Sequence, residues 1–436
     1  MKAAIAAGHP LTAEAGARVL EAGGNAVDAC ITAAFAASVT EGPLTGPAGG
    51  GFLLAYVDRE PLLLDCFFAA PSRPLSAMEE IVVDFGDAST QVFHVGEESV
   101  AVPGLLAGLE EAHRRFGRLD WAQLVEPAIE LARTGVAVSE AQAVLHTILR
   151  SVLQRDGGGR RIYGTPERLA TEDYVPTLES IRDRGAAAVL ELLPELESDL
   201  AAYAVVDREP VRTTSFGREV LATPAPSRGG GIVAVALEGL EQARSLDERA
   251  RALQVAYASA PPARMAGTTH ISVVDKLGNA AALSSTLGSG SGVFRGGTQL
   301  NNMLGERDVI GERTLDPGER LPSMMSPTLV LEDGRPRLAL GSAGSVRLAG
   351  AIAQVTDAVL RDVPLEQAIA APRIHVDVQL LHLEGGIPNE PLPGWEVVRW
   401  ASRNLFFGGV SAVELRADGT FAAAGDPRRA GHGIVV

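Results

Sequence analysis

The sequence predicts an α+β fold in which two groups of β-strands share one hydrophobic core. Apolar residues recur with helical spacing through most of residues 104–262, and from residue 268 the spacing changes to the two-residue period of strands. A further group of strand-like segments lies at residues 46–68. Because no clean linker or internal repeat separates these regions, we expect the helices and both groups of strands to pack together.

The composition restricts the function. The 436 residues are 46% hydrophobic and carry a net charge of −16 that is spread along the chain. An acidic surface repels nucleic acids and anionic lipids, so we expect neither as a partner. The chain has two cysteines and no metal-ligand spacing such as CxxC or HExxH, which predicts a reducing compartment and no bound metal.

The chain is expected to be cytoplasmic. No uninterrupted apolar run reaches the roughly 18 residues that a membrane span requires. His9 and Pro10 interrupt the N-terminal apolar run too early for a signal peptide.

Residues 11–39 predict two helices. Thr12 is a candidate N-cap with Glu14 in the first turn, and Gly23 and Gly24 would end the first helix. The next segment, NAVDACITAAFAASVT, is apolar on almost every face, which is typical of a buried helix.

A glycine-rich loop then leads into a strand, GPAGGGFLLAYV, at residues 46–57. The segment PLLLDCFF, residues 61–68, would pair with it as a hairpin. The loop lacks the Lys-Ser/Thr of a phosphate-binding loop and precedes its strand, so we expect it to serve packing or to form a pocket wall.

Later segments divide by their spacing. Helices are predicted at GLLAGLEEAHRRFG, WAQLVEPAIELARTG, AQAVLHTILRSVLQR and SLDERARALQVAYASA, and one more at residues 347–370. The glycine-rich run at residues 156–161 predicts a mobile loop. Strands are predicted at THISVVD, NAAALSST, TLVLED, RPRLALGS, GVSAVELRADG and FAAAGD.

The turn after Asp275 sets the register of the hairpin that begins near residue 268. A three-residue loop ending at Gly278 places a glycine where a left-handed residue is needed. In that register Thr268 lies opposite Thr286. Cross-strand threonine pairs are ordinary in sheets, so the pair alone favours a structural role.

A chemical role needs a free N-terminus at Thr268. An N-terminal threonine can act as a complete catalyst, because its hydroxyl is the nucleophile and its α-amine, with a pKa of about 8, is the base. The same hydroxyl can expose that amine by attacking the carbonyl of Gly267. Glycine suits the preceding position, since it tolerates a strained backbone and has no side chain to block the attack.

The segment TTHISVVDKLGNAAALSSTLG resembles the processing site of the γ-glutamyltranspeptidase family of N-terminal nucleophile (Ntn) hydrolases. Other segments agree in family order over nearly the whole chain, among them VAVPGLLAGLEEAHRRFG, PAPSRGGG, LNNMLGE, SMMSPTLVLEDG, GSAGSVR and GDPRRAG. The resemblance implies a four-layer αββα sandwich and a precursor that cleaves itself, with no cofactor. The products would be a large subunit, residues 1–267, and a small catalytic subunit, residues 268–436, which together form one domain. The resemblance also allows a dimer of such cleaved heterodimers.

The resemblance also implies the roles of individual residues. Thr268 would be the nucleophile, released by cleavage after Gly267, and Thr286 would hydrogen-bond it. The backbone N–H groups of Gly344 and Ser345 would form the oxyanion hole. Ser345 stands where the family has a second glycine, and we expect little effect because the donors are main-chain groups.

The positions that bind glutamate in the family differ here. Phe67 stands in place of the arginine that binds the α-carboxylate, and the two side chains are not interchangeable. The other corresponding residues are Gly288 for an asparagine, Met303 for a glutamine, Glu306 for an aspartate that holds the substrate amine, and Ser323 with Met324 for a serine pair. The pocket becomes apolar, so we expect a small substrate other than a standard γ-glutamyl compound.

Four further residues have two interpretations each. His270 shares the face of Thr268 and would either support the structure or contact the site. Cys66 would be a small buried hydrophobe or line the pocket. Arg347 and Arg373 would form core ion pairs or bind a carboxylate.

Three functions remain open from the sequence. The leading hypothesis is a self-cleaving threonine hydrolase or acyltransferase. A second, which the resemblance implies through homologues of the family in antibiotic pathways, is hydrolysis of a carbon–carbon bond in the biosynthesis of the 4-alkylproline unit of lincosamide or pyrrolobenzodiazepine antibiotics. The third is a binding protein that kept the fold and lost the activity, although the intact Gly-Thr-Thr-His and Thr286 argue against it.

Overall fold

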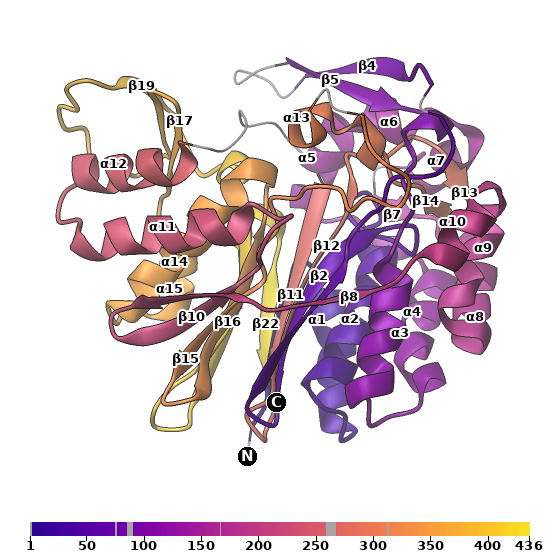
Figure 1. Ribbon diagram of the computed structural model, residues 1–436, viewed down its shortest axis with the longest axis horizontal. Helices are drawn as coiled ribbons and strands as arrows, with labels where there is room; N and C mark the ends of the chain where they lie inside the picture. Colours follow the sequence, from indigo (N-terminus) through magenta and orange to yellow (C-terminus); the bar gives the residue numbers. More distant parts are fainter. Residues whose placement is uncertain (1, 75, 85–89, 166, 259–266, 312–313) are drawn as a thin grey trace.

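Two large antiparallel sheets lie at the centre of the molecule, and helices cover the outer face of each (Figure 1). The computed structural model describes residues 2–74, 76–84, 90–165, 167–258, 267–311 and 314–436. The sheets face each other, with strand β11 packed against strands β16 and β20. The arrangement is the expected α+β sandwich with the layers αββα.

The first sheet has the strand order β22-β1-β11-β12-β2-β3-β8. Its strands are β1 (Ala4–Ala7), β2 (Gly50–Val57), β3 (Glu60–Cys66), β8 (Val206–Arg208), β11 (Gly267–Val274), β12 (Ala280–Gly288) and β22 (His432–Val435). Strands from before and after residue 267 are therefore hydrogen-bonded to one another within one sheet. The hairpin of β2 and β3 is present as predicted.

The second sheet has the strand order β21-β20-β16-β15-β10-β9. Its strands are β9 (Val211–Ser215), β10 (Arg218–Ala222), β15 (Thr328–Glu332), β16 (Arg335–Ala343), β20 (Gly409–Leu415) and β21 (Phe421–Gly425). The four strands after residue 268 were predicted. Strands β8, β9 and β10 were missed, because these short strands are rich in charged and polar residues and lie in a region of mainly helical spacing.

The helices α1 (Pro10–Glu21), α2 (Ala26–Thr40) and α3 (Leu105–Phe116) pack on the first sheet, α4 (Trp121–Thr134) packs on α2, and α8 (Val175–Arg184) packs on α4. Every residue of α2 is buried, which confirms the predicted buried helix. The predicted N-cap Thr12 is wrong. His9 caps α1 by accepting a hydrogen bond from the Leu11 N–H, and Pro10 occupies the first helical position, where no N–H is needed.

The second sheet is covered by α11 (Gly229–Gln242), α12 (Leu246–Tyr257), α14 (Leu348–Leu360) and α15 (Leu365–Ala370). The single helix predicted at residues 347–370 is thus two helices. Asp362 takes a left-handed conformation, with φ of 64°, and Pro364 cannot continue a helix, so the chain turns between α14 and α15.

The predicted mobile loop at residues 156–161 is also wrong, because this segment forms helix α7 (Gly157–Ile162). The Asp156 carboxylate caps it by accepting a hydrogen bond of 2.8 Å from the Gly159 N–H. The ring of Phe294 packs closely over Gly158 and Gly159. Capping and tertiary packing therefore outweigh the low helix propensity of three glycines.

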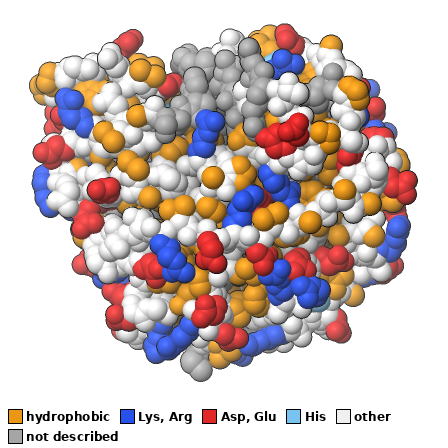
Figure 2. Space-filling view, in the orientation of Figure 1, with side chains coloured by type: hydrophobic (Ala, Val, Ile, Leu, Met, Phe, Trp, Pro, Cys, Tyr) orange, Lys and Arg blue, Asp and Glu red, His pale blue; other side chains and the backbone are white. Residues whose placement is uncertain are grey.

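The remaining elements are short and lie around the sandwich. They are α5 (Glu140–Ile148), α6 (Arg150–Leu153), α9 (Val189–Leu192), α10 (Glu197–Ala202), α13 (Arg307–Ile310), β4 (Glu79–Asp84), β5 (Thr90–Val95), β6 (Val136–Ala137), β7 (Arg168–Leu169), β13 (Phe294–Arg295), β14 (Thr298–Gln299), β17 (Ile374–Asp377), β18 (Leu380–Leu383) and β19 (Glu396–Arg399). In the described part of the chain, no helix has the length and apolar character to cross a membrane. Acidic and basic side chains are interspersed on the face shown in Figure 2.

Candidate active site

The hairpin of β11 and β12 has the predicted turn and, over most of its length, the predicted register. Gly278 is left-handed, with φ of 83°, and the pairing extends from Val274 opposite Ala280 to Thr269 opposite Ser285. At the open end the ladder is irregular, and Gly267 lies opposite Gly288. The simple pairing of Thr268 with Thr286 is therefore replaced by a β-bulge, a local irregularity that re-aims side chains near functional sites.

Thr286 holds the carbonyl group that precedes Thr268. Its hydroxyl donates a hydrogen bond to the Gly267 carbonyl oxygen and accepts one of 2.8 Å from the Gly288 N–H. Both threonines are buried, with Thr268 only 3% exposed. The hydroxyl of Thr286 thus lies on the acyl side of the Gly267–Thr268 bond.

Gly267 fits only as glycine. A Cβ atom at this position would lie 2.8 Å from the Gly288 carbonyl oxygen and 3.2 Å from both the Leu44 side chain and the Pro43 carbonyl oxygen. A side chain would displace the backbone at the predicted cleavage site. The tight packing holds the Gly267 carbonyl where Thr286 can reach it.

Thr269 connects the site to the helical layer. Its hydroxyl donates a hydrogen bond of 2.7 Å to the Glu41 carboxyl group, which follows the last residue of α2. Thr12, inside α1, contacts the same carboxyl group at 3.4 Å. Burial raises the pKa of Glu41 to about 7, although the threonine hydroxyls and the charge of Arg429 act in the opposite direction. Sequence reasoning missed Glu41, whose signal was an acidic residue directly after a wholly buried helix.

His270 lies between the sheets, with its ring against Gly341 of β16. Its two ring nitrogens form hydrogen bonds of 2.8 Å with Ser284 and 2.9 Å with Ser272. Burial lowers the pKa of His270 to about 3, so the ring is neutral at physiological pH. These contacts favour the structural interpretation.

The turn of Gly344 and Ser345 joins β16 to the start of α14. Both residues have positive φ, 134° at Gly344 and 58° at Ser345. A Cβ atom at Gly344 would lie 2.8 Å from the Cα atom of Gly408. The preceding residue, Ala343, lines the same pocket as Thr268, so the turn lies at the edge of that pocket.

The three apolar residues at positions that correspond to glutamate-binding residues lie in the protein interior. Phe67, Met303 and Met324 are all buried in one hydrophobic core. Phe67 is 1% exposed and stacks on Phe52 with 5.3 Å between ring centroids. Phe67 is therefore a packed core residue.

The polar residues of this region bond to the protein itself. Gly288 has φ of 71°, and a Cβ there would lie 3.2 Å from both Met303 and Glu306. Glu306 accepts hydrogen bonds from the Ser289 N–H, at 2.8 Å, and from the Ser289 hydroxyl, at 2.5 Å. Ser323 accepts a bond of 3.0 Å from the Met325 N–H. Gly288, Met303 and Glu306 thus lie close together. The Ser323 hydroxyl instead bonds to the backbone of its own loop.

Two of the remaining candidates are structural. Cys66 is buried, its thiol donates to the Gly51 carbonyl at 3.2 Å, and burial raises the pKa of this thiol to about 12. Arg373 is 2% exposed and is paired with Asp426 at 2.6 Å. The guanidinium of Arg347 lies 4.4 Å from the centre of the Phe406 ring.

Thr268, Thr269 and His270 line one pocket between the layers. Its walls are mainly apolar and include Pro43, Leu44, Ala141, Leu145 and Leu405, and its charged lining residues include Glu41 and Arg429. Within the described ranges, no three His, Cys, Asp or Glu side chains are grouped so as to hold a metal ion. The arrangement combines a buried threonine hydroxyl, a carbonyl held by a hydrogen bond and an apolar pocket.

Comparisons with known proteins agree with this arrangement. A family model described as gamma-glutamyltranspeptidase matches residues 12–257 and 244–436. The glutathione hydrolase proenzyme of Pseudomonas aeruginosa is 29% identical, over 99% of this chain and 94% of that protein. The acylase ACY 1 proenzyme of Pseudomonas sp. strain SE83 is 28% identical, over 99% of this chain and 93% of that protein. The crystal structure of cephalosporin acylase from Bacillus halodurans has the same fold, with a TM-score of 0.83 at 19% identity, over 99% of this chain and 95% of that chain. The chain therefore belongs to the gamma-glutamyltranspeptidase family.

Proposed function

We propose that this protein is a self-cleaving N-terminal threonine hydrolase or acyltransferase that acts on a small, largely apolar acyl compound. The observation that carries the proposal is the hydrogen bond from the Thr286 hydroxyl to the Gly267 carbonyl, at the irregular end of the ladder where Thr268 lies. The names of the relatives, which are proenzymes of a hydrolase and of an acylase, agree with it.

Self-cleavage uses the Thr268 hydroxyl. Its oxygen forms a bond to the Gly267 carbonyl carbon, the hydroxyl proton moves to the peptide nitrogen, and the carbon–nitrogen bond breaks. The product is an ester with a free α-amine on Thr268. Water then hydrolyses the ester, which leaves a carboxylate on Gly267 and restores the hydroxyl. The Thr286 hydrogen bond polarises the carbonyl that is attacked.

Turnover repeats the same chemistry on a substrate. The α-amine of Thr268 accepts the hydroxyl proton while the oxygen attacks the substrate carbonyl. The main-chain N–H groups of Gly344 and Ser345 stabilise the oxyanion, a contribution that is typically worth about 100- to 1,000-fold in rate per donor. Water, or an amine acceptor, then releases the acyl group.

The presence of Phe67 in place of the family's arginine argues for a substrate without a glutamyl head group. A stacked benzyl ring cannot form the bidentate contact that an arginine makes with a carboxylate. The apolar walls of the pocket that Thr268 lines are the reason to keep hydrolysis of a carbon–carbon bond next to a carbonyl as a second candidate, since they suit an alkyl-substituted substrate.

Intact mass spectrometry and a denaturing gel test the proposal. We expect fragments 1–267 and 268–436 from the natural chain and a single uncut chain from Thr268→Ala, while Thr268→Ser should still cleave. A natural chain that stays uncut would instead support a binding protein on the same fold. The cleaved protein is then incubated with γ-glutamyl, β-lactam and pyrroline acid compounds, and the mass of any acyl adduct on the small fragment distinguishes the substrate classes.

A further inference from the structure

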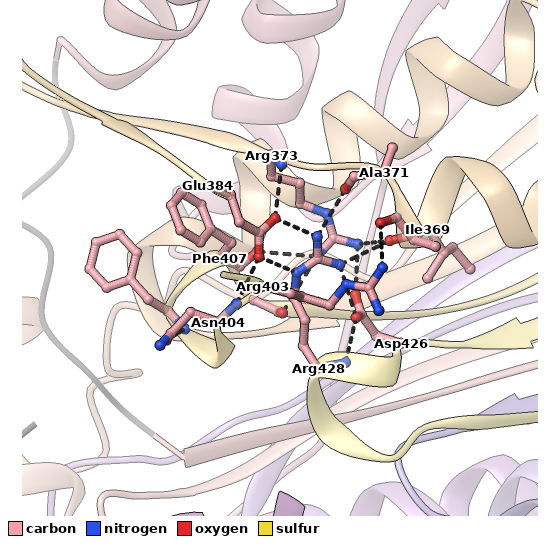
Figure 3. A network of polar contacts seen from close by, with 12 residues as sticks. Ile369, Ala371, Arg373, Glu384, Arg403, Asn404, Phe407, Asp426 and Arg428 are labelled. Atoms are coloured by element: carbon pink, nitrogen blue, oxygen red, sulfur yellow. Dashed lines mark hydrogen bonds and ion pairs between the residues drawn. The ribbon is translucent and has the colours of Figure 1, made fainter. Parts of the chain in front are cut away.

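Arginine and carboxylate side chains cluster beside the pocket that contains Thr268. Among the described residues, one arginine of this cluster has no carboxylate partner. The cluster contains Arg373, Glu384, Asp426, Arg428 and Arg429, which come from the ends of β17, β18 and β21 and from the turn after β21. Figure 3 shows the network that Arg373 and Arg428 form with the two acids.

The two carboxylates are fully used within this network. The Glu384 carboxylate accepts two hydrogen bonds from the Arg428 guanidinium, at 2.7 and 2.5 Å, and one of 2.9 Å from the main-chain N–H of Arg373. Asp426 accepts from the Arg373 guanidinium at 2.6 Å, from Arg428 at 3.1 Å and from the Val410 N–H at 3.0 Å. Two acids thus balance two guanidinium groups, and all four side chains are buried.

Arg429 is the guanidinium without a carboxylate. Among the described residues its side chain has no ion pair, and its Nε is buried with no hydrogen-bond acceptor. The acids that act on it from further away are Asp426, already paired, and Glu41, whose carboxyl group accepts hydrogen bonds from Thr269 and Thr12. The neighbouring Arg347 adds positive charge, since Arg429 helps to lower the pKa of Arg347. An unpaired guanidinium in a largely desolvated position is costly unless an anion meets it.

The position of Arg429 connects it to the reacting groups. Its aliphatic stem packs over Gly409, where a Cβ atom would lie only 2.5 Å from the Arg429 Cδ. Gly409 pairs with Ala343, the residue before Gly344. Arg429 also lines the pocket together with Thr268 and the apolar residues Leu145 and Leu405. A ligand in this pocket therefore meets a cation, an apolar wall and the nucleophile.

We propose that Arg429 is a substrate-binding residue that holds a carboxylate, and that the ligands of this pocket are small carboxylates with an apolar body. The site differs from the position of Phe67, where the family places its arginine. The planar guanidinium fork matches a carboxylate in a bidentate contact. The inference rests on the proposed function only in calling the ligand a substrate.

Calorimetry with two matched probes tests the site. The probes are 4-methylpentanoate and its neutral amide, 4-methylpentanamide, added to the full chain as purified. We expect the carboxylate to bind about 10- to 100-fold more tightly than the amide, which is the range for a hydrogen bond to a charged group. Equal binding of the two probes, or binding of neither, overturns the proposal, and this comparison needs no variant.

Variants then assign the effect to one side chain. Arg429→Met should remove the preference for the carboxylate, and Arg429→Lys should keep part of it because the charge remains. Arg335→Met is the matched control, since Arg335 is exposed at the start of β16. A preference that survives Arg429→Met in a folded protein overturns the proposal. Inorganic phosphate should bind more weakly than the carboxylate because it has no apolar body, and equal affinity would make this a general anion site instead.

The outcome of the binding test does not depend on the outcome of the cleavage test. Calorimetry is repeated on the Thr268→Ala chain, which cannot cleave itself. If that chain prefers the carboxylate but the natural chain never cleaves, the anion site stands and the proposed enzyme function falls. If the natural chain cleaves but shows no preference for the carboxylate, the enzyme function stands and the anion site falls.

Discussion

The hydroxyl of Thr286 donates a hydrogen bond to the carbonyl oxygen of Gly267, the residue that precedes the expected nucleophile. The resemblance implied that this hydroxyl bonds to Thr268 itself. In the uncut chain the Thr286 hydroxyl instead donates its hydrogen bond to the carbonyl that Thr268 would attack. Cleavage would release this acceptor, and the Thr286 hydroxyl would then be available to the new N-terminal residue.

Thr286→Val should slow self-cleavage by about 100-fold or more, because valine keeps the shape and removes the donor to the carbonyl. Thr286→Ser should recover most of the rate. The measurement is the fraction of cleaved chain over time on a denaturing gel. Equal cleavage rates for the valine and serine variants would show that the hydrogen bond has no part in the reaction.

Gly267→Ala should also slow self-cleavage, because the added Cβ would lie 2.8 Å from the Gly288 carbonyl and push the backbone away from Thr286. The matched control is Gly231→Ala, since a Cβ at Gly231 meets no atom within 4 Å. Mass spectrometry of both variants after the same incubation gives the comparison. Normal cleavage of Gly267→Ala would contradict the importance of close packing here.

Gly344→Ala should reduce turnover by about 100-fold while the chain still folds, because φ of 134° and the contact with Gly408 force the turn to move and displace the N–H donors. Gly419→Ala is the control, since Gly419 also has a positive φ of 81° but has open space around it. Turnover is measured on whichever acyl compound forms an adduct. A similar loss in both variants would point to general backbone strain and not to the oxyanion hole.

Glu41→Gln should raise the free energy of unfolding, relative to the chain with Glu41, more at high pH than at low pH. Burial raises the pKa of Glu41 from its ordinary value of 4.5 to about 7, so the folded state holds a proton that the unfolded state releases between these values. The folded chain with Glu41 therefore loses stability as pH rises from about 4.5 to about 7, by about 3 kcal/mol in total. The glutamine variant lacks this loss.

Urea unfolding of the uncut Thr268→Ala chain, with and without Glu41→Gln, measures this difference at pH 4.5 and pH 8. Glu366→Gln, at an exposed position in α15, corrects for the removal of one acidic group. A difference between the variants that is the same at both pH values would show that Glu41 is not protonated in the folded chain.

The sequence by itself determined the hairpin that begins near Thr268, the buried helix α2 and the four strands of the second sheet after residue 268. These features depend on local patterns: a left-handed glycine at Gly278, an all-apolar helix and alternating strands. Local patterns gave wrong predictions where capping and tertiary packing decide the structure. Thr12 is not the N-cap of α1, and the glycine-rich segment predicted as a loop forms helix α7.

The contacts around the candidate site were decided by the tertiary structure alone. The hydrogen bond from Thr269 to Glu41 joins residues 228 positions apart. Among the described residues Arg429 has no carboxylate partner. Arg373 and Glu384 come from other parts of the chain, and the neighbouring Arg428 pairs with both acids, so that Asp426 and Glu384 are already satisfied. No local spacing encodes which charged groups meet in a buried space, since that follows from how the two sheets and their helices pack.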